Sequence, residues 1–364
     1  MLKRVVYLSS SLVIAVFAIM VAMAGGPTVF MDLIKQKFQA DLVVDVTSNQ
    51  RKRGPFEGAD LVGRRALVTG ANRGLGKAIS QVLLENHADS VLMTGRNIER
   101  CRTAAAEIIA RESGNGKLEG GGLGPRVGTA ELDLGSFASI DRFVEELKSK
   151  STSATDAGVN TIVLNAAVAG IVPQDRETGM NPILGVNFVG NVYLLDSLLR
   201  ANLVNKDTSI IVVTSGAHVL GDPESFPIWT ANPSFCYSPG RLEGLRASSW
   251  RGGAGMNPKK PFIVYWNPGP VDTGLGEDSV PSLLFPIYWL MKRMFFVEPL
   301  KVARTAAYLL SDPPPVRPGT YFNMREIAQP HPFTGNSSFQ QRVYEETKGL
   351  ICRLSNSDQE GCIA

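Results

Sequence analysis

The chain has 364 residues, enough for one large α/β domain or for two domains of ordinary size. Hydrophobic residues make up 44% and charged residues 20%, which excludes a chain that is disordered throughout. The formal net charge of +3 is too small to indicate a nucleic-acid partner. Three histidines and four widely separated cysteines indicate neither a metal site nor a disulfide framework.

The N-terminal segment, residues 1–37, contains an uncharged run from Val5 to Met31. Its 27 residues, at ~1.5 Å each, can cross a hydrocarbon layer of ~30 Å as a helix. We therefore predict a single-pass membrane anchor, in the endoplasmic reticulum or another endomembrane. Two alternatives are a buried core helix and a signal peptide cleaved after Ala22-Met23-Ala24, which would leave the protein in the secretory or organelle lumen.

Three further segments follow the hydrophobic run. Residues 38–60 are polar and basic and are predicted to be a linker. Residues 61–330 hold the apolar periodic segments and are predicted to form one soluble domain. Residues 331–364 are predicted to be a polar C-terminal tail with a short helix around residues 340–350.

The predicted domain begins with a strand, a glycine-rich turn, a helix and a second strand. Residues 65–69 form a short apolar run, and three glycines stand in the turn over residues 70–76. Apolar residues then recur at helical spacing over 78–83, and residues 90–94 read as the second strand. Such a turn brings backbone N–H groups to a pyrophosphate, although three glycines alone could serve a tight turn only. The cofactor-binding candidates here are Gly70, Asn72, Arg73, Gly74, Leu75 and Gly76.

The residues after the second strand bear on which cofactor binds. A carboxylate there would bind the ribose 2′-hydroxyl of NAD, but residues 94–97 contain none. Arg96 and Arg73 instead offer guanidinium groups, which suit a 2′-phosphate. The pattern favours NADP(H) over NAD, unless both arginines are only solvated surface residues.

Taken with later motifs, this sequence resembles the short-chain dehydrogenase/reductase family. Residues 69–76 match its T-G-x-x-x-G-x-G pattern, and later segments resemble its adenine-contacting acid, its N-A-G motif and its P-G-x-V-x-T loop. The resemblance covers about residues 61–330 and implies a Rossmann-type, doubly wound parallel sheet in a single catalytic domain. The cofactor-binding residues that it implies are Asp133, Leu134, Asn165, Ala166, Ala167 (in place of the usual glycine), Pro268, Gly269, Val271 and Thr273.

The same resemblance implies four catalytic residues for hydride transfer coupled to proton transfer. Tyr237 is the predicted acid/base, Ser215 orients the reacting oxygen, and Asn187 belongs to a proton relay. Arg241 stands where the family has a lysine that lowers the pKa of the tyrosine. On their residues alone, Tyr237 could be a packing tyrosine, Ser215 a turn residue and Asn187 a hydrogen-bonded buried amide.

The segment around Tyr237 departs from the family pattern. The planar guanidinium of Arg241 is not equivalent to an ammonium group, and Pro239 and Gly240 interrupt the expected helix. These departures support an alternative function, a nucleotide-binding pseudoenzyme with a regulatory or scaffold role. In the family this helix commonly packs against a partner subunit, so the resemblance also leaves room for a homodimer.

A second apolar stretch, from Val280 to Met291, follows the P-G loop. Within the family, this stretch and the segment beginning at Ser215 resemble the retinol dehydrogenase and WW-domain oxidoreductase branch, in which the stretch caps the substrate pocket. That implies a lipophilic substrate of the retinoid, sterol or fatty aldehyde type, whose alcohol and carbonyl forms are interconverted with NADP(H). The stretch could also touch the bilayer, or be an ordinary amphipathic core helix.

Overall fold

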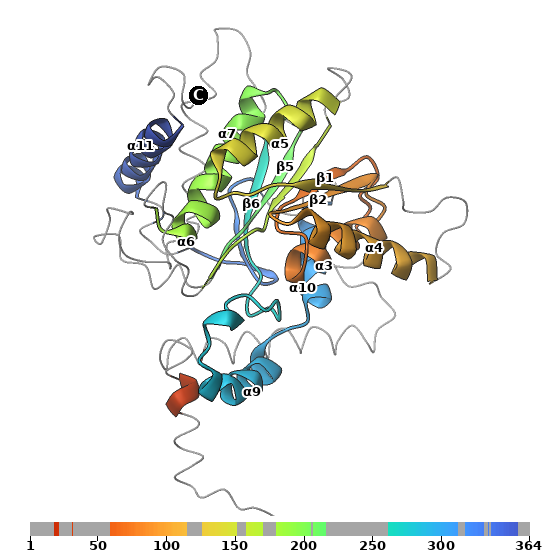
Figure 1. The fold of residues 1–364 in the computed structure, drawn as a ribbon, viewed down its shortest axis with the longest axis vertical. Helices are drawn as coiled ribbons and strands as arrows, with labels where there is room; N and C mark the ends of the chain where they lie inside the picture. The colour runs from red at the N-terminus through yellow and green to blue at the C-terminus, as the bar shows by residue number, and fades with distance from the viewer. Residues whose placement is uncertain are drawn as a thin grey trace, which may run out of the picture.

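The structure is a computed structural model of the chain (Figure 1). Its described part contains an eight-stranded sheet in the order β3-β2-β1-β4-β5-β6-β7-β8. The first seven of these are parallel, and β8 runs antiparallel to β7. The structure describes residues 18–21, 31, 59–114, 126–150, 158–169, 180–204, 207–215, 261–311, 317–330, 334 and 336–355.

The order of the first six strands is that of a Rossmann-type fold, as the sequence predicts. The strands are β1 Arg65–Val68, β2 Ser90–Gly95, β3 Val127–Glu131, β4 Thr161–Leu164, β5 Ser209–Val213, β6 Phe262–Asn267, β7 Tyr321–Asn323 and β8 Glu326–Ile327. The α-helices are α3 Gly74–Glu85, α4 Ile98–Gly114, α5 Phe137–Lys150, α6 Pro182–Leu184, α7 Gly190–Arg200, α9 Phe285–Phe295, α10 Pro299–Leu309 and α11 Ser337–Leu354.

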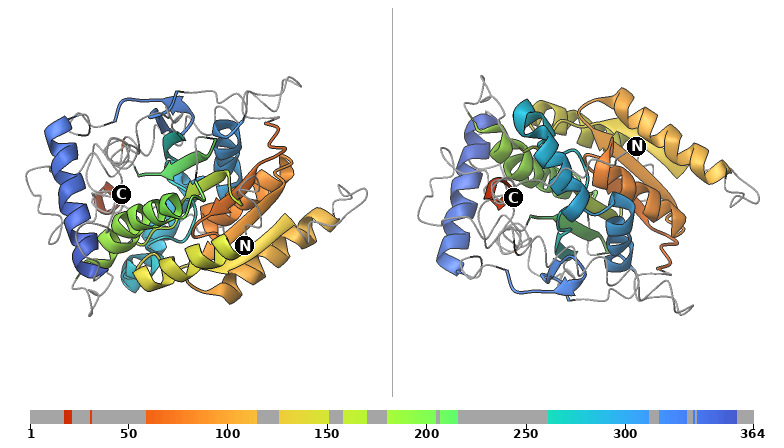
Figure 2. Two further views of the ribbon diagram at one scale, coloured as in Figure 1. Left: turned by 90° about the horizontal axis from the view of Figure 1, so that it is seen from above. Right: turned by 90° about the horizontal axis from the view of Figure 1, so that it is seen from below.

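Helices cover both faces of the sheet. Neighbouring residues on a strand point to opposite faces, so Leu67 belongs to the core on the side of α5, α7 and α11, whereas Val68 belongs to the core on the side of α3, α4 and α10. Views from above and below show the two helical layers, with α11 beside α7 (Figure 2). The predicted doubly wound architecture is therefore correct for the described residues.

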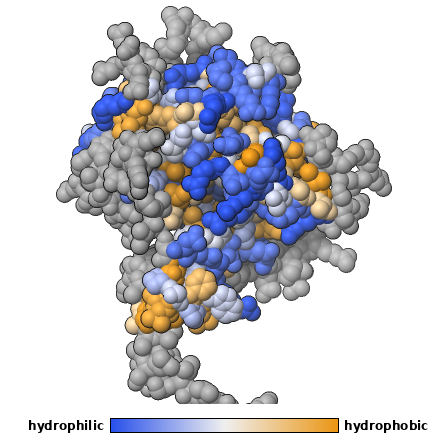
Figure 3. All heavy atoms as spheres, in the orientation of Figure 1, coloured by the Kyte–Doolittle hydropathy of each residue, from blue (hydrophilic) through white to orange (hydrophobic). Residues whose placement is uncertain are grey.

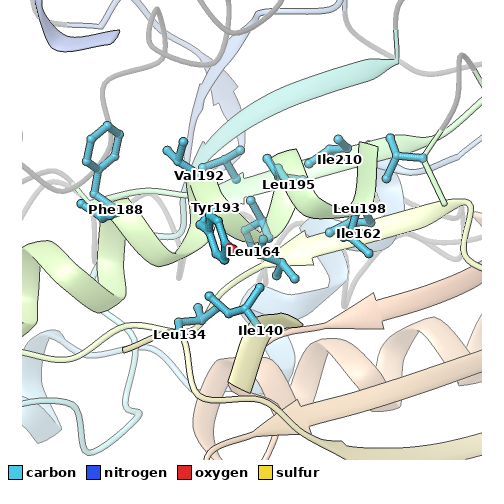
Figure 4. Packing of buried hydrophobic residues seen from close by; sticks show 14 of the residues in the cluster. Leu134, Ile140, Ile162, Leu164, Phe188, Val192, Tyr193, Leu195, Leu198 and Ile210 are labelled. Atoms are coloured by element: carbon cyan, nitrogen blue, oxygen red, sulfur yellow. The ribbon is translucent and has the colours of Figure 1, made fainter. Parts of the chain in front are cut away.

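A continuous apolar helix crosses one face of the sheet. It comprises α6, a π-helical turn over Gly185–Val189, and α7. The side chain of Asn181 caps its start by accepting a hydrogen bond of 2.9 Å from the Ile183 N–H. Among the described residues this is the one helix long and apolar enough to cross a membrane, yet 83% of its apolar window is buried inside the protein. Its side chains fill the core in Figure 4, so we assign it to the domain interior.

One residue of this core also carries a polar contact. The hydroxyl of Tyr193 lies 2.9 Å from a carboxylate oxygen of Asp141 on α5. Burial and the Asp141 carboxylate raise the pKa of Tyr193 to about 12. The phenol therefore stays neutral and ties α5 to α7 at physiological pH.

The C-terminal segment differs from the polar tail that its composition predicts. The helix α11 extends beyond residues 340–350 at both ends, and four of its six buried side chains belong to the main core. Cys352 within it is disulfide-bonded, whereas the sequence signalled no disulfide. Residues 336–355 are therefore part of the domain. The buried residues of α11 are Phe339, Val343, Tyr344, Thr347, Ile351 and Cys352.

Most of the hydrophobic N-terminal run lies outside the described residues, and so does the predicted linker up to residue 58. The structure therefore does not support the predicted transmembrane helix. The described helical residues 18–21 pack against α9, where Met20 contacts Met291 and Phe295.

Gly190 offers a test of the packing between α7 and the loop after β3. A Cβ at this position would overlap the carbonyl oxygen of Leu134, which is backbone and cannot rotate away. We expect Gly190→Ala to lower the free energy of unfolding by about 1–3 kcal/mol or more. Gly158→Ala is the matched control, since nothing lies within 4 Å of its added Cβ. Equal urea midpoints for the two variants would contradict this packing.

Candidate active site

The turn after β1 and the loop after β4 meet at the carboxyl edge of the sheet. Gly70, with a φ of +65°, is so close to Ala166 that an added Cβ would lie 2.8 Å from its Cα. The Thr69 hydroxyl accepts hydrogen bonds of 2.9 and 3.0 Å from the N–H groups of Asn165 and Ala166. This is the point where the strand order reverses, the usual ligand-binding crevice of such sheets.

The other two glycines of the motif also make close contacts. A Cβ on Gly76 would lie 2.5 Å from both the Asn165 side chain and the Gly70 carbonyl oxygen. Gly74, with a φ of +55°, faces Thr273 in the loop after β6 at 2.9 Å. The motif therefore joins three loops, and each glycine is required by close packing at its position.

The helix α3 begins at Gly74 with a free N-terminus. Within the described residues, no side chain caps it and its first turn contains no acidic residue. Its first N–H groups and its dipole are therefore available to an anion. Arg73 precedes it and Arg96 follows β2, and both side chains are exposed. The two loops are adjacent, since the Ala71 N–H donates to the Thr94 carbonyl oxygen at 2.9 Å.

The two residues expected to contact adenine have different environments. Asp133 is partly exposed, and one of its carboxylate oxygens accepts a hydrogen bond of 2.9 Å from the Gly135 N–H. Leu134 is buried in the main core, as Figure 4 shows. Asp133 is therefore at the surface of the site, whereas the side chain of Leu134 supports it from within the core.

The loop after β6 is held by a polar cluster. The Gly269 N–H, at a φ of +77°, donates to the Asn267 side-chain oxygen at 3.1 Å. The Asn267 side-chain nitrogen donates to the Asn323 side-chain oxygen on β7 at 2.8 Å, and the Thr214 N–H after β5 donates to the Trp266 carbonyl oxygen at 2.7 Å. Burial raises the pKa of Tyr321 on β7 to about 12, although the nearby Asn267 and Thr214 side chains act in the opposite direction. The cluster thus joins the carboxyl ends of β5, β6 and β7.

Two more predicted residues of this loop are buried. Pro268 follows β6 directly, and Val271 pairs with Val297 through an isolated parallel bridge. The Asp272 N–H also donates to the Val297 carbonyl oxygen at 2.9 Å. Val297, which follows α9, is therefore hydrogen-bonded to the loop that is predicted to bind the nicotinamide.

Asn187 lies in the π-helical turn and is 3% exposed. Its side-chain oxygen accepts from the Val168 N–H at 2.8 Å, and its side-chain nitrogen donates to the Val168 carbonyl oxygen at 2.9 Å. The buried amide is thus satisfied by the loop after β4. That loop carries Ala167, which is exposed at the site.

The predicted catalytic serine stands at the carboxyl end of β5. Ser215 is exposed there, and the neighbouring strand β4 ends in the loop that Asn187 holds. Tyr237 and Arg241 lie outside the described residues. The structure thus brings the glycine turn, the loops after β4 and β6, Asn187 and Ser215 to one edge of the sheet.

Two groups at this edge are missing from the sequence-based candidates. The sequence shows Thr69 as the threonine of the glycine motif, but it does not show that the Thr69 hydroxyl accepts hydrogen bonds from the loop after β4. Lys292 on α9 forms ion pairs with Glu277 and, at 2.6 Å, with Asp272. Burial alone would lower the pKa of Lys292, but its hydrogen bonds to the two carboxylates outweigh burial and raise it. These partners lie 15 and 20 residues away in sequence, so no local pattern signals them.

This parallel α/β sheet, with its glycine turn at the switch point, defines a dinucleotide-binding fold. The family described as short chain dehydrogenase matches residues 64–227. The retinol dehydrogenase 14 of Mus musculus is 29% identical over 277 residues, which is 73% of this chain and 78% of that protein. The WW domain-containing oxidoreductase of Drosophila melanogaster is 25% identical over 84% of this chain and 72% of that protein.

A solved structure shows the same fold. The crystal structure of an uncharacterized protein from Mycobacterium paratuberculosis superposes with a TM-score of 0.56 at 18% identity, covering 81% of this chain and 96% of that one. By these comparisons the chain is similar to the short-chain dehydrogenase/reductase family, and within that family to the retinol dehydrogenases and the WW domain-containing oxidoreductase.

The Thr69 hydroxyl can be tested by an isosteric change. Thr69→Val leaves the N–H groups of Asn165 and Ala166 without their acceptor, so we expect a loss of about 1–3 kcal/mol in unfolding free energy. NADPH affinity should fall as well, because the switch-point loops loosen. Thr103→Val on the exposed side of α4 is the control. Urea unfolding and NADPH fluorescence measure both effects, and equal behaviour of the two variants would refute the role of Thr69.

Proposed function

We propose that this protein is an NADP(H)-dependent oxidoreductase that interconverts an alcohol and a carbonyl on a lipophilic small molecule of the retinoid, sterol or fatty aldehyde type. The single observation that carries the proposal is the uncapped start of α3 at the switch point, flanked by Arg73 and Arg96. The retinol dehydrogenase names of the relatives support the substrate class. We further propose that residues 1–37 anchor the protein in an endomembrane.

The residues at the edge of the sheet fit a nicotinamide dinucleotide. The first N–H groups of α3 would bind the pyrophosphate, and Arg73 and Arg96 a 2′-phosphate. Asp133 would contact the adenine, and the loop from Pro268 to Thr273 would hold the nicotinamide end. When bound, the cofactor supplies or accepts the hydride.

The chain's own residues would move the proton and orient the substrate. Tyr237 would donate a proton to the carbonyl oxygen in reduction and accept it from the alcohol in oxidation. The Ser215 hydroxyl would hold that oxygen by a hydrogen bond. Arg241 would supply positive charge beside Tyr237, and Asn187 would take part in the proton relay.

A pseudoenzyme is the second candidate function. Its basis is the sequence from Tyr237 to Arg241, where an arginine replaces the family's lysine behind Pro239 and Gly240. In that case the dinucleotide would bind as a regulatory or structural ligand. The two functions differ in whether bound NADPH is consumed.

Cofactor choice depends on the two arginines in this proposal. Arg73→Ala and Arg96→Ala should each weaken NADPH binding by about 10- to 100-fold, because each removes charge-assisted hydrogen bonds to the 2′-phosphate. NADH binding should change little. Arg102→Ala, another exposed arginine of this region, is the control. Fluorescence titrations with both nucleotides measure the difference, and parallel losses for NADPH and NADH would rule out the 2′-phosphate contact.

Turnover separates the enzyme from the pseudoenzyme. With the full chain in detergent and a panel of aldehydes and ketones, Tyr237→Phe should reduce NADPH consumption by about 10²- to 10⁴-fold and leave NADPH binding intact. Arg241→Lys should retain or raise turnover, whereas Arg241→Ala should remove it. NADPH binding without consumption on any substrate by the unmodified chain would favour the pseudoenzyme.

A further inference from the structure

The helix α9 exposes several large apolar side chains. Leu283, just before it, is 86% exposed and Trp289 is 56% exposed. Hydrophobic residues gather over this part of the molecule in Figure 3. Side chains at positions i and i+4 of a helix are neighbours, so Phe285 adjoins Trp289 and Leu290 adjoins Met294, with the exposed Arg293 between the two pairs. The exposed apolar surface consists of Leu283, Phe285, Trp289, Leu290 and Met294.

The side chains of α9 are oriented differently from those of a helix that faces water. Lys292 turns inward, where it is paired with Asp272 and Glu277. The other charged residue of the helix, Arg293, lies over the ring of Trp289 with 5.8 Å between guanidinium and ring centroid. A helix beside water directs its lysines outward and its tryptophans inward. The outer side of α9 is therefore built for an apolar neighbour with a polar boundary.

The chain itself indicates what that neighbour is. On its inner side, α9 contacts Met20 and Val21, which belong to the uncharged run of residues 5–31. Tryptophan and arginine are the residue types found where hydrocarbon meets water, since each has an apolar body and a polar end. The helix α9 thus lies against a segment whose composition suits lipid, and its own exposed side bears the residue types of a membrane interface.

We propose that α9 docks on the surface of a phospholipid bilayer, with Phe285, Trp289, Leu290 and Met294 in its interfacial layer. The helix would lie in the plane of the membrane rather than cross it, because its eleven residues are too short to span. Docking rests on α9 and its contact with Met20 and Val21, and it stands apart from the proposed chemistry. If that chemistry holds, the docked helix brings the loop after β6 to the bilayer, where a lipophilic substrate is dissolved.

The test uses the emission of Trp289 in the full chain, reconstituted in phosphatidylcholine vesicles with plain or brominated acyl chains. Subtracting the spectrum of Trp289→Phe from that of the unmodified chain isolates the Trp289 component. We expect this component to shift to shorter wavelength on vesicles and to lose most of its intensity when the acyl chains are brominated. A Trp289 component with equal intensity in both kinds of vesicle would overturn the proposal.

A tryptophan elsewhere provides the matched control. Val62 is also exposed, but it precedes β1 and so lies at the opposite edge of the sheet. Val62→Trp in the Trp289→Phe background should show no quenching by brominated lipid. Equal quenching at both positions would mean that the protein adsorbs without orientation, which contradicts docking by α9.

Two further measurements distinguish lipid docking from self-association and from loss of the nucleotide site. If a second copy of the chain covers α9, the Trp289 emission will shift with protein concentration in the absence of lipid and resist brominated chains, which would overturn lipid docking. NADPH binding by the same samples reports on the nucleotide site. Quenching without NADPH binding would refute the proposed function and leave the docking proposal standing.

Discussion

The close approach of backbone at the switch point governs the rest of the site. Gly70 and Ala166 leave no room for a side chain between the turn after β1 and the loop after β4. The Thr69 hydroxyl fixes that distance, because a single oxygen accepts both N–H groups of the facing loop. Since Gly74 and Gly76 allow α3 to begin at once, its first N–H groups point to the edge of the sheet rather than into a cap. The packing of these loops alone therefore leaves backbone N–H groups available to an anion, without any contribution from charged side chains.

The loop after β4 is held from its other side as well. Asn187 uses both its side-chain oxygen and its side-chain nitrogen on Val168, so this buried amide has its hydrogen-bonding capacity largely committed to the loop. A relay function for Asn187 must therefore work through its remaining hydrogen-bonding capacity or through its backbone. The π-helical turn supports this arrangement, since it interrupts the regular helix at the residue whose side chain reaches the loop.

Local patterns predicted the parts of the structure that depend on local geometry. The glycine spacing after Thr69 and the apolar period of α3 are such patterns, and they predict the strand, the glycine turn and the helix that the structure has. The ion pairs of Lys292 could not be predicted, because the fold brings its two carboxylates from a separate loop. The apolar stripe of α11 was present in sequence, but its many polar neighbours concealed it. Tyr237 and Arg241 remain predictions, since they lie outside the described residues.

The charge balance around Lys292 connects α9 to the choice of cofactor. Asp272 and Glu277 stand close to the loop that faces α3, and a negative field there would oppose a phosphorylated ligand. Lys292 offsets one of these two negative charges from a largely buried position, where its charge is screened less than at the surface. Arg73 lies within reach of the same loop, with a guanidinium nitrogen 3.6 Å from the Cβ position of Gly274. The inward turn of Lys292 thus reduces the negative charge beside the site, and it leaves Arg293, which lies over Trp289, as the exposed charge of α9.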